Sequence, residues 1–434
     1  MKKMFTSVLI ALALISCEKP QQNEDTGKGD IPADNTSQTD GSHGSFTDNQ
    51  STPLIPTGPI DMTPVREVLG VTHASSQYSL TDEPILIEGA KKLLELGTKC
   101  IKLWFVKPLS SYVFNSEWNP NADSYNYVSL AKTPYFKEVF DMDFKVYSLE
   151  ATDRIINWRD GLTAQEAETV FDMNYNLAKH FLTEYAGTGK TFIIQNWEGD
   201  GHLSAESLTE SEQTVAITGM IDWANTRQEA IEKARKDFGC NNVLVVHAFE
   251  FNYVKVTNKQ PPYVIETVVP YTNCDLYSYS SYTSGKSEDV LDDIYMRLEY
   301  IKEEAPDSVL YGENNIMIGE FGYDERSSHT NQGWNLTVSE ETDAKQKYMV
   351  QQQLERLFDI GVNYIFYWQL YCNGAVNPDG SAGATEPQNG VELDTNQLKG
   401  FWLIRPDGSK TKTYEYFKGL FEANENVKAQ RPRF

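Results

Sequence analysis

Carboxylates lie at or near the ends of several apolar runs of this sequence, and two of them are candidates for reactive groups. Glu198 closes the run 191–198, and Glu320 stands between Gly319 and Phe321 in the run 315–322. Desolvating a carboxylate is costly, so a Glu inside an apolar run indicates a function or an ion pair. Two carboxylates are the minimum for breaking a glycosidic bond, because one protonates the leaving oxygen and the other attacks the anomeric carbon or activates water.

Aromatic and amide side chains accompany these carboxylates. The flat faces of sugar rings stack on Trp and Tyr, and sugar hydroxyl groups pair with Asn, Gln and carboxylates. A Tyr can also hold a carboxylate nucleophile by a hydrogen bond. The residues of these types in or next to the apolar runs are candidates for binding a carbohydrate: Trp104, Asn196, Trp197, Asn252, Tyr277, Tyr279 and Trp368.

Glu250 is a third candidate carboxylate. Strand alternation would place Glu250 and Asn252 on one face. Glu250 could bind a sugar hydroxyl, replace Glu198 as the proton donor, or pair with a Lys on the outer surface. Asp200, two residues after Glu198, is expected to be solvated.

Eight apolar runs position these residues, and helical stretches separate most of them. The expected strands are 67–74, 99–105, 144–151, 191–198, 242–251, 274–282, 315–322 and 362–371. Three of the helical stretches end in Gly, at positions 97, 239 and 361, as helix ends often do. This pattern predicts a (β/α)8 barrel, in which chemistry lies at the carboxyl ends of the strands. A doubly wound sheet is the alternative, but neither GxGxxG nor GxxxxGK[ST] occurs.

The order of elements resembles glycoside hydrolase clan A, the retaining (β/α)8 enzymes. The resemblance covers about residues 66–428. Asn196 and Glu198 end the fourth run, Glu320 lies in an Ile-Gly-Glu-Phe-Gly setting in the seventh, and Trp368 lies in the eighth. The segment 403–408 (LIRPDG) is also similar to the C-terminal pattern of the clan.

The resemblance implies roles for these residues. Glu198 would be the acid/base, Glu320 the nucleophile, and Trp368 a platform for a sugar ring. The sequence departs from the pattern of the clan at three places: Trp197 separates Asn196 from Glu198, Lys102 stands where an Arg is common, and Tyr277 and Tyr279 replace a His of the sixth strand.

The N-terminus has the features of a lipoprotein signal. Two Lys precede a short apolar core, and Leu14-Ile15-Ser16-Cys17 resembles a bacterial lipobox. We therefore expect three parts: a signal peptide at 1–16, a lipidated Cys17 with a flexible linker through 59, and a (β/α)8 domain that resembles glycoside hydrolases at 60–434. The expected location is the bacterial cell envelope, with the lipid as the only membrane contact.

Composition excludes several classes of function. Asp and Glu number 62 against 38 Lys and Arg, a formal charge of −24, so binding to nucleic acid is not expected. No His, Cys and Asp cluster has metal-ligand spacing, and we expect neither a metal nor a cofactor. The absence of GxSxG argues against a serine esterase. Cys240 and Cys274 could form a disulfide, although buried free thiols are expected for most of the cysteines.

Together these features predict a retaining glycosidase that degrades a poly- or oligosaccharide. The alternative is a non-catalytic glycan-binding lipoprotein on the same barrel, because a fold does not fix a function. A second alternative is a barrel hydrolase or lyase that uses Glu250 rather than Glu198.

Overall fold

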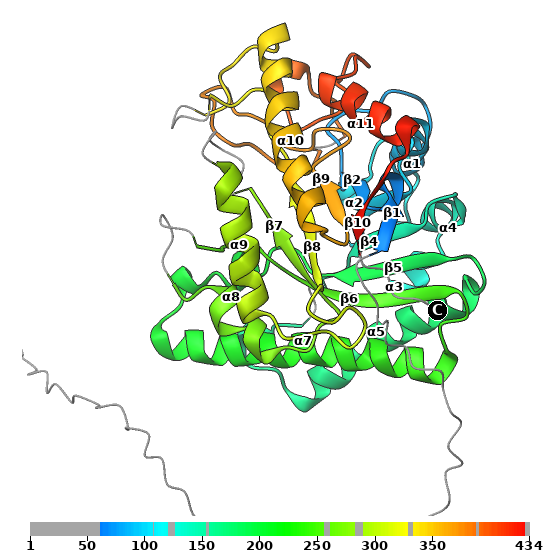
Figure 1. The fold of residues 1–434 in the computed structure, drawn as a ribbon, viewed down its shortest axis with the longest axis vertical. Helices are drawn as coiled ribbons and strands as arrows, with labels where there is room; N and C mark the ends of the chain where they lie inside the picture. The colour runs from blue at the N-terminus through cyan, green and yellow to red at the C-terminus, as the bar shows by residue number, and fades with distance from the viewer. Residues whose placement is uncertain are drawn as a thin grey trace, which may run out of the picture. The chain divides into compact units, whose positions relative to one another are not determined.

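Eight parallel strands form a closed barrel in chain order (Figure 1). The computed structural model describes residues 61–429 except 107, 120–125, 153–155, 256–260, 283–289, 329–332 and 388–389. The (β/α)8 prediction is confirmed, and every expected apolar run overlaps one barrel strand. These strands are β2 (Leu69–His73), β3 (Cys100–Trp104), β4 (Val146–Glu150), β5 (Lys190–Gln195), β6 (Val243–Phe251), β7 (Leu276–Ser280), β8 (Ile316–Phe321) and β9 (Ile365–Tyr367).

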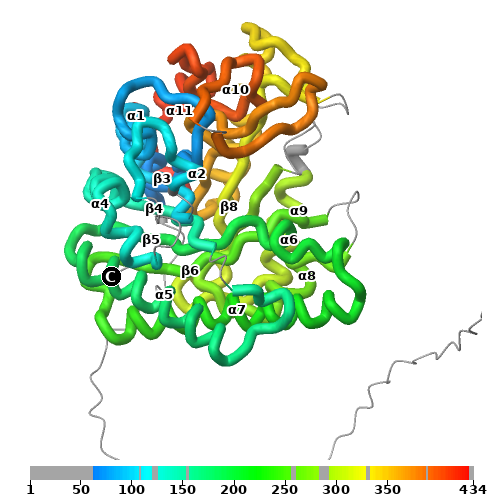
Figure 2. Tube along the Cα trace, turned by 180° about the vertical axis from the view of Figure 1, so that it is seen from behind, coloured from blue at the N-terminus to red at the C-terminus, as the bar shows by residue number. Residues whose placement is uncertain are grey.

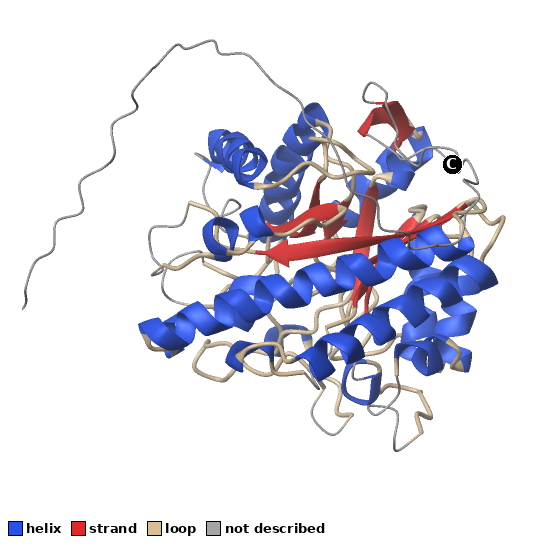
Figure 3. Cartoon of the chain, turned by 90° about the horizontal axis from the view of Figure 1, so that it is seen from below, coloured by secondary structure: helices blue, strands red, loops and turns tan. Residues whose placement is uncertain are grey.

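Helices surround the barrel strands (Figures 2 and 3). The longer ones are α1 (Ile85–Leu96), α4 (Pro134–Asp141), α5 (Ala164–Glu184), α7 (Glu210–Phe238), α9 (Val290–Glu304), α10 (Glu340–Ile360) and α11 (Lys412–Ala423). Short helices lie in the loops: α2 (Pro108–Ser111), α3 (Tyr127–Ala131), α6 (Gly199–Leu203) and α8 (Val264–Thr267). Within the described residues, no helix is both long enough and apolar enough to cross a bilayer.

Local signals fix the helix ends. Gly97 and Gly361 adopt the left-handed conformation after α1 and α10, with φ of 112° and 84°. The helical pattern of residues 221–239 predicts a helix that begins near residue 221, yet α7 begins at Glu210. A capping box explains the difference, because Thr209 accepts from the backbone of Glu212 and the Glu212 carboxylate accepts from the backbone of Thr209.

A small second sheet was not predicted. Strand β1 (Asp61–Pro64) pairs antiparallel with β10 (Asn426–Ala429). The helical pattern of residues 411–427 predicts a last helix that reaches residue 427, but α11 ends at Ala423, and Asn424 after it takes the left-handed conformation. The expected signal peptide, Cys17 and linker lie outside the described residues. Among the described residues, Cys100, Cys240, Cys274 and Cys372 are thiols, so Cys240 and Cys274 form no disulfide.

The barrel interior changes from apolar to polar along the strands. On β6, Val246 and Ala248 belong to an apolar cluster inside the barrel, and Glu250 follows them on the same face. On β7, Leu276 belongs to that cluster, while the Ser278 hydroxyl reaches Glu250. Apolar side chains therefore fill the barrel toward the amino ends of the strands, and the polar side chains lie at the carboxyl end.

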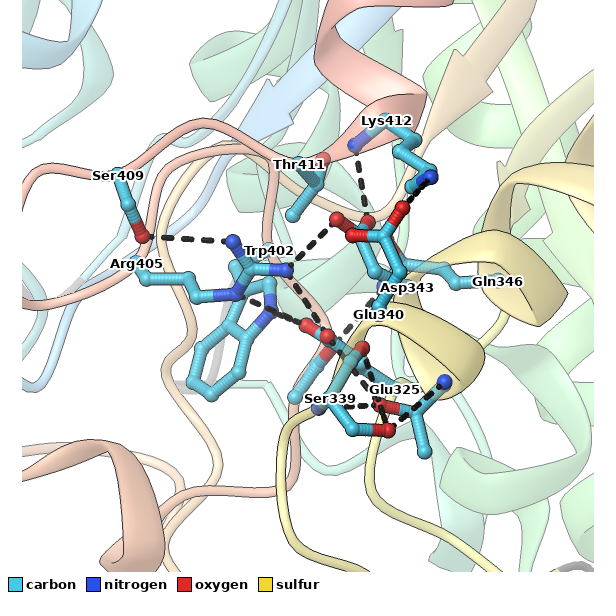
Figure 4. Close-up of polar contacts among 12 residues, drawn as sticks. Glu325, Ser339, Glu340, Asp343, Gln346, Trp402, Arg405, Ser409, Thr411 and Lys412 are labelled. Carbon is cyan, nitrogen blue, oxygen red and sulfur yellow. Dashed lines mark hydrogen bonds and ion pairs between the residues drawn. The ribbon is translucent and has the colours of Figure 1, made fainter.

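A buried ionic cluster holds the C-terminal segment to the barrel (Figure 4). Glu325, after β8, accepts hydrogen bonds from Trp402 Nε1 at 2.6 Å and from Arg405 Nε at 3.1 Å and Nη2 at 2.9 Å. Arg405 Nη2 also lies 3.2 Å from Asp343 Oδ2 on α10. One guanidinium therefore joins three segments that are distant in sequence.

We expect the Arg405→Met variant to lose about 3 kcal/mol of unfolding free energy, because it leaves Glu325 buried without its counter-charge. Denaturant unfolding followed by circular dichroism measures the change. Lys137→Met is the matched control, since it removes an exposed pair with Asp141 and should leave the midpoint unchanged. Equal midpoints for Arg405→Met and the parent chain would show that the cluster does not stabilise the fold.

Candidate active site

Glu198 lies just after β5, at the start of α6, and its carboxylate faces the carboxyl end of the barrel. Ser280 Oγ donates to Glu198 Oε1 at 2.8 Å, and Asn252 Nδ2 donates to Oε2 at 2.9 Å. Strand β5 ends at Gln195, so the alternation of side chains along a regular strand does not extend to Glu198. The carboxylate is oriented instead by neutral donors from β7 and from the end of β6.

Asp200 is buried, contrary to the solvated position expected from the sequence. Its carboxylate accepts backbone hydrogen bonds from Asn252 and Tyr253 at 3.0 Å and from Val264 at 2.9 Å. Three backbone donors satisfy a buried carboxylate well. Asp200 therefore fixes the segment that carries Asn252, and Asn252 in turn contacts Glu198.

Glu320, on β8, is held by a cation and a phenol. Lys102 Nζ donates to Glu320 Oε1 at 2.9 Å, and the Tyr282 hydroxyl donates to Oε2 at 3.2 Å. Tyr282 was not among the predicted site residues, although it is the last residue of the expected sixth run. The register shift between Tyr279 and Ser280 accompanies the end of regular alternation there, so counting along the strand could not place it.

A buried polar layer supports the two carboxylates from below. Lys102 Nζ also lies 3.3 Å from Glu250 Oε2, which accepts from Gln195 Nε2 and Ser278 Oγ, both at 2.8 Å. Gly319 makes room for this arrangement, because a Cβ there would lie 2.0 Å from Glu250 Oε2. Lys102 thus links Glu250 to Glu320.

Glu250 and Asn196 were predicted to contact substrate, and the structure does not place them where they can. Both side chains are fully buried, so not even a water molecule reaches them. Asn196 Nδ2 donates to the carbonyl of Glu250 at 2.8 Å, and Asn196 Oδ1 accepts from the Glu250 backbone N–H at 2.9 Å. The Asn196 amide therefore joins the end of β5 to β6 rather than facing the opening of the barrel.

Tyr277 and Tyr279 were also predicted to bind substrate, but they point away from the barrel interior. Both are buried in the large core between strands and helices, and the Tyr277 hydroxyl donates to the Thr272 carbonyl at 3.0 Å. Successive side chains of a strand face opposite sides. Because Ser278 and Ser280 face inward, the two tyrosines must face outward.

The predicted tryptophans lie at the carboxyl end and are partly exposed. Trp104 and Trp368 face each other with ring centroids 6.1 Å apart. Trp197 packs edge-on against His202 at 5.4 Å. The partly exposed side chains of the site are Trp104, Trp197, Glu198, Asn252, Tyr282 and Trp368. Glu320 is buried but keeps 3% of its surface exposed, whereas Glu250 keeps none.

Burial raises the pKa of both reachable carboxyl groups. Desolvation, with a smaller contribution from the charge of Glu320, raises the pKa of Glu198 to about 8. Desolvation also raises the pKa of Glu320, to about 7, although Lys102 opposes the rise. Burial lowers the pKa of Lys102, but Glu250 and Glu320 together hold it above its ordinary value. Glu198 therefore keeps its proton more readily than Glu320 does.

The described residues hold no group of three or more His, Cys, Asp or Glu side chains arranged to bind a metal ion.

Comparison with known proteins relates this chain to solved structures alone. No family model and no curated protein sequence matches it. A GH5_18 glycoside hydrolase from Bifidobacterium longum subsp. infantis superposes with a TM-score of 0.50 at 11% identity, covering 84% of this chain and 80% of that one. A GH5_18 enzyme from Streptomyces cattleya, in complex with GlcNAc, gives a TM-score of 0.51 at 10% identity, covering 86% and 83%. The chain shares the (β/α)8 fold of these hydrolases.

Proposed function

We propose that this chain is a retaining glycoside hydrolase. The observation that carries the proposal is the unequal environment of two reachable carboxyl groups at the carboxyl end of the barrel. Glu198 is held by Ser280 and Asn252, which are neutral donors, whereas Glu320 is held by the ammonium group of Lys102. Environments that separate the pKa values of two carboxyl groups suit one to be an acid and the other a nucleophile.

The reaction follows in two steps. Glu320 attacks the anomeric carbon while Glu198 gives its proton to the leaving oxygen, and a covalent glycosyl–enzyme forms. Glu198, now ionised, removes a proton from water, which attacks the same carbon and releases the sugar with its configuration retained. Trp104 and Trp368 would stack on the sugar rings.

The proposed location is the bacterial cell envelope. The lipobox-like segment ending at Cys17 and the polar linker after it support a tethered domain. An enzyme held in this way would meet poly- or oligosaccharides at or near the cell surface.

We expect a bell-shaped dependence of kcat/KM on pH, with a maximum between about pH 7 and 8. The rate rises as Glu320 ionises through its pKa of about 7, and it falls as Glu198 loses its proton through a pKa of about 8. The two limbs report macroscopic constants of the coupled pair. Initial rates on an aryl glycoside from pH 4 to 10 measure them. A maximum near pH 4.5 to 5 would contradict the raised pKa values.

A panel of polysaccharides and aryl glycosides tests the proposed function. Sugar release identifies the substrate, and proton NMR of the first product shows its anomeric configuration. Retention is expected, with the two carboxyl groups ~5–5.5 Å apart, whereas an inverted product would contradict the mechanism. If no sugar is released but one polysaccharide is bound, the chain is a glycan-binding protein.

A further inference from the structure

A cavity of about 540 Å³ lies outside the catalytic group. It is lined by the start of α1 and the residues before it, by residues 117–119, and by the start of α4. Helix starts and the loops after strands lie at the catalytic end of a (β/α)8 barrel. The cavity therefore opens at the same end as Glu198 and Glu320, yet it shares no lining residue with them. Its volume is in the range of small-molecule sites, roughly 300–1,000 Å³.

Two aromatic rings, both partly exposed, form part of the cavity wall. The centroids of Trp118 and Tyr135 are 4.3 Å apart, and their planes are inclined by 44°. Trp118 Nε1 donates to the carbonyl of Tyr112 at 2.8 Å, and the Tyr135 hydroxyl accepts from the Glu117 backbone N–H at 2.6 Å. Backbone hydrogen bonds hold both rings, so they need little ordering when a ligand binds.

The segment before α1 is held as firmly. Glu88, buried in α1, accepts from the backbone N–H and from the hydroxyl of Thr81, at 2.7 and 2.6 Å. Glu83 follows two residues later and pairs with Lys91 at 2.5 Å. This part of the lining therefore has a fixed backbone, and it carries an ion pair.

The charges around the cavity disfavour an anionic ligand. The charged side chains among its described lining residues are three carboxylates, Glu83, Glu117 and Glu138, and one amine, Lys91. The amine is already paired with Glu83, whereas Glu117 and Glu138 are exposed. Such a rim accepts hydrogen bonds from hydroxyl groups and repels a uronate or a phosphate.

We propose that this cavity binds an uncharged stretch of a glycan, away from the bond that is cleaved. The proposal takes from the proposed function that a glycan is the substrate. One residue, Tyr112, contacts both the cavity and the catalytic site. Its carbonyl accepts from Trp118 of the cavity, and its hydroxyl accepts from the backbone N–H of Trp104 at 3.1 Å. A glycan chain crossing this end of the barrel would meet both aromatic surfaces.

Affinity electrophoresis of the full chain tests the proposal. Glu320→Gln is present in every sample so that bound glycan is not consumed, and the gels contain β-glucan, mannan, xylan or polygalacturonate. We expect a neutral polysaccharide to retard the parent, and Trp118→Ala to weaken this binding about tenfold. Tyr271→Ala, which removes an exposed aromatic ring elsewhere, should bind as the parent does.

Glu138→Lys provides a second variant, because its side chain is exposed and the substitution should leave folding intact. We expect it to weaken binding of the neutral glycan too. The proposal is wrong if both variants are retarded as strongly as the parent, if polygalacturonate is bound as tightly as the neutral glycans, or if no polysaccharide is bound. Hydrolysis by the unsubstituted chain is measured separately, so binding that depends on Trp118 without hydrolysis would reject the proposed enzyme and keep this site.

Discussion

The Glu320→Gln variant is expected to hydrolyse its best aryl glycoside at least about 10⁴-fold more slowly than the parent chain. An amide oxygen cannot form the glycosyl ester, so the covalent intermediate is lost. The substitution also removes the negative charge that faces Lys102 Nζ at 2.9 Å. An amide of nearly the same shape can still accept this hydrogen bond through its oxygen, so the fold should survive while the reaction stops.

Initial rates at saturating substrate measure this effect, with unfolding midpoints as the check on structure. Glu313→Gln is the matched control, because Glu313 is exposed just before β8. It should keep the parent rate. If Glu320→Gln keeps more than about a tenth of the parent rate, Glu320 is not the nucleophile, whatever the chain hydrolyses.

Much of the fold could be predicted because the same pattern, a short apolar run, occurs eight times along the chain. The runs 242–251 and 315–322 are apolar and β-branched, so their burial as barrel strands follows from composition. Glu198 and Glu320 stood out for the same reason, as carboxylates at the ends of such runs. Glu198 lies just after β5 and Glu320 lies in β8, both at the carboxyl end of the barrel.

The partners of these carboxylates could not be predicted so well. The direction of a side chain near the end of a strand depends on where regular pairing stops, and the sequence does not mark that residue. Tyr277 and Tyr279 were assigned to the site because they are tyrosines at a strand end, while Tyr282, three residues further on, holds Glu320. Asn196 was assigned by analogy with an Asn-Glu pair, and its amide instead bonds the backbone of Glu250.

Lys102, which stands where an Arg is common in the clan that the sequence resembles, affects both carboxylates beside it. It is fully buried between Glu250 and Glu320, at 3.3 and 2.9 Å. A buried ammonium group near two carboxylates lets at least one of them stay ionised. Glu250 therefore needs no contact with substrate to matter, since it helps to keep Lys102 charged beside Glu320.

The Glu198→Gln variant should separate the two roles of Glu198. For substrates with poor leaving groups, we expect a loss of about 10²- to 10⁴-fold, because the leaving oxygen is no longer protonated. For a dinitrophenyl glycoside the first step needs no acid, so the glycosyl–enzyme should form and accumulate. Azide needs no general base and should restore turnover, giving a glycosyl azide of retained configuration.

Rates across a series of aryl leaving groups, with and without azide, measure this behaviour. Glu206 is an exposed carboxylate close by in the chain, so Glu206→Gln should show the rates of the parent chain for every leaving group, with and without azide. Glu250→Gln decides between the two candidate donors. Because the Glu250 carboxylate is fully buried against Lys102, Gln195 and Ser278, its loss should slow all leaving groups alike, with no rescue by azide. If Glu250→Gln instead slows only the substrates with poor leaving groups and is rescued by azide, Glu250 is the proton donor and Glu198 is not.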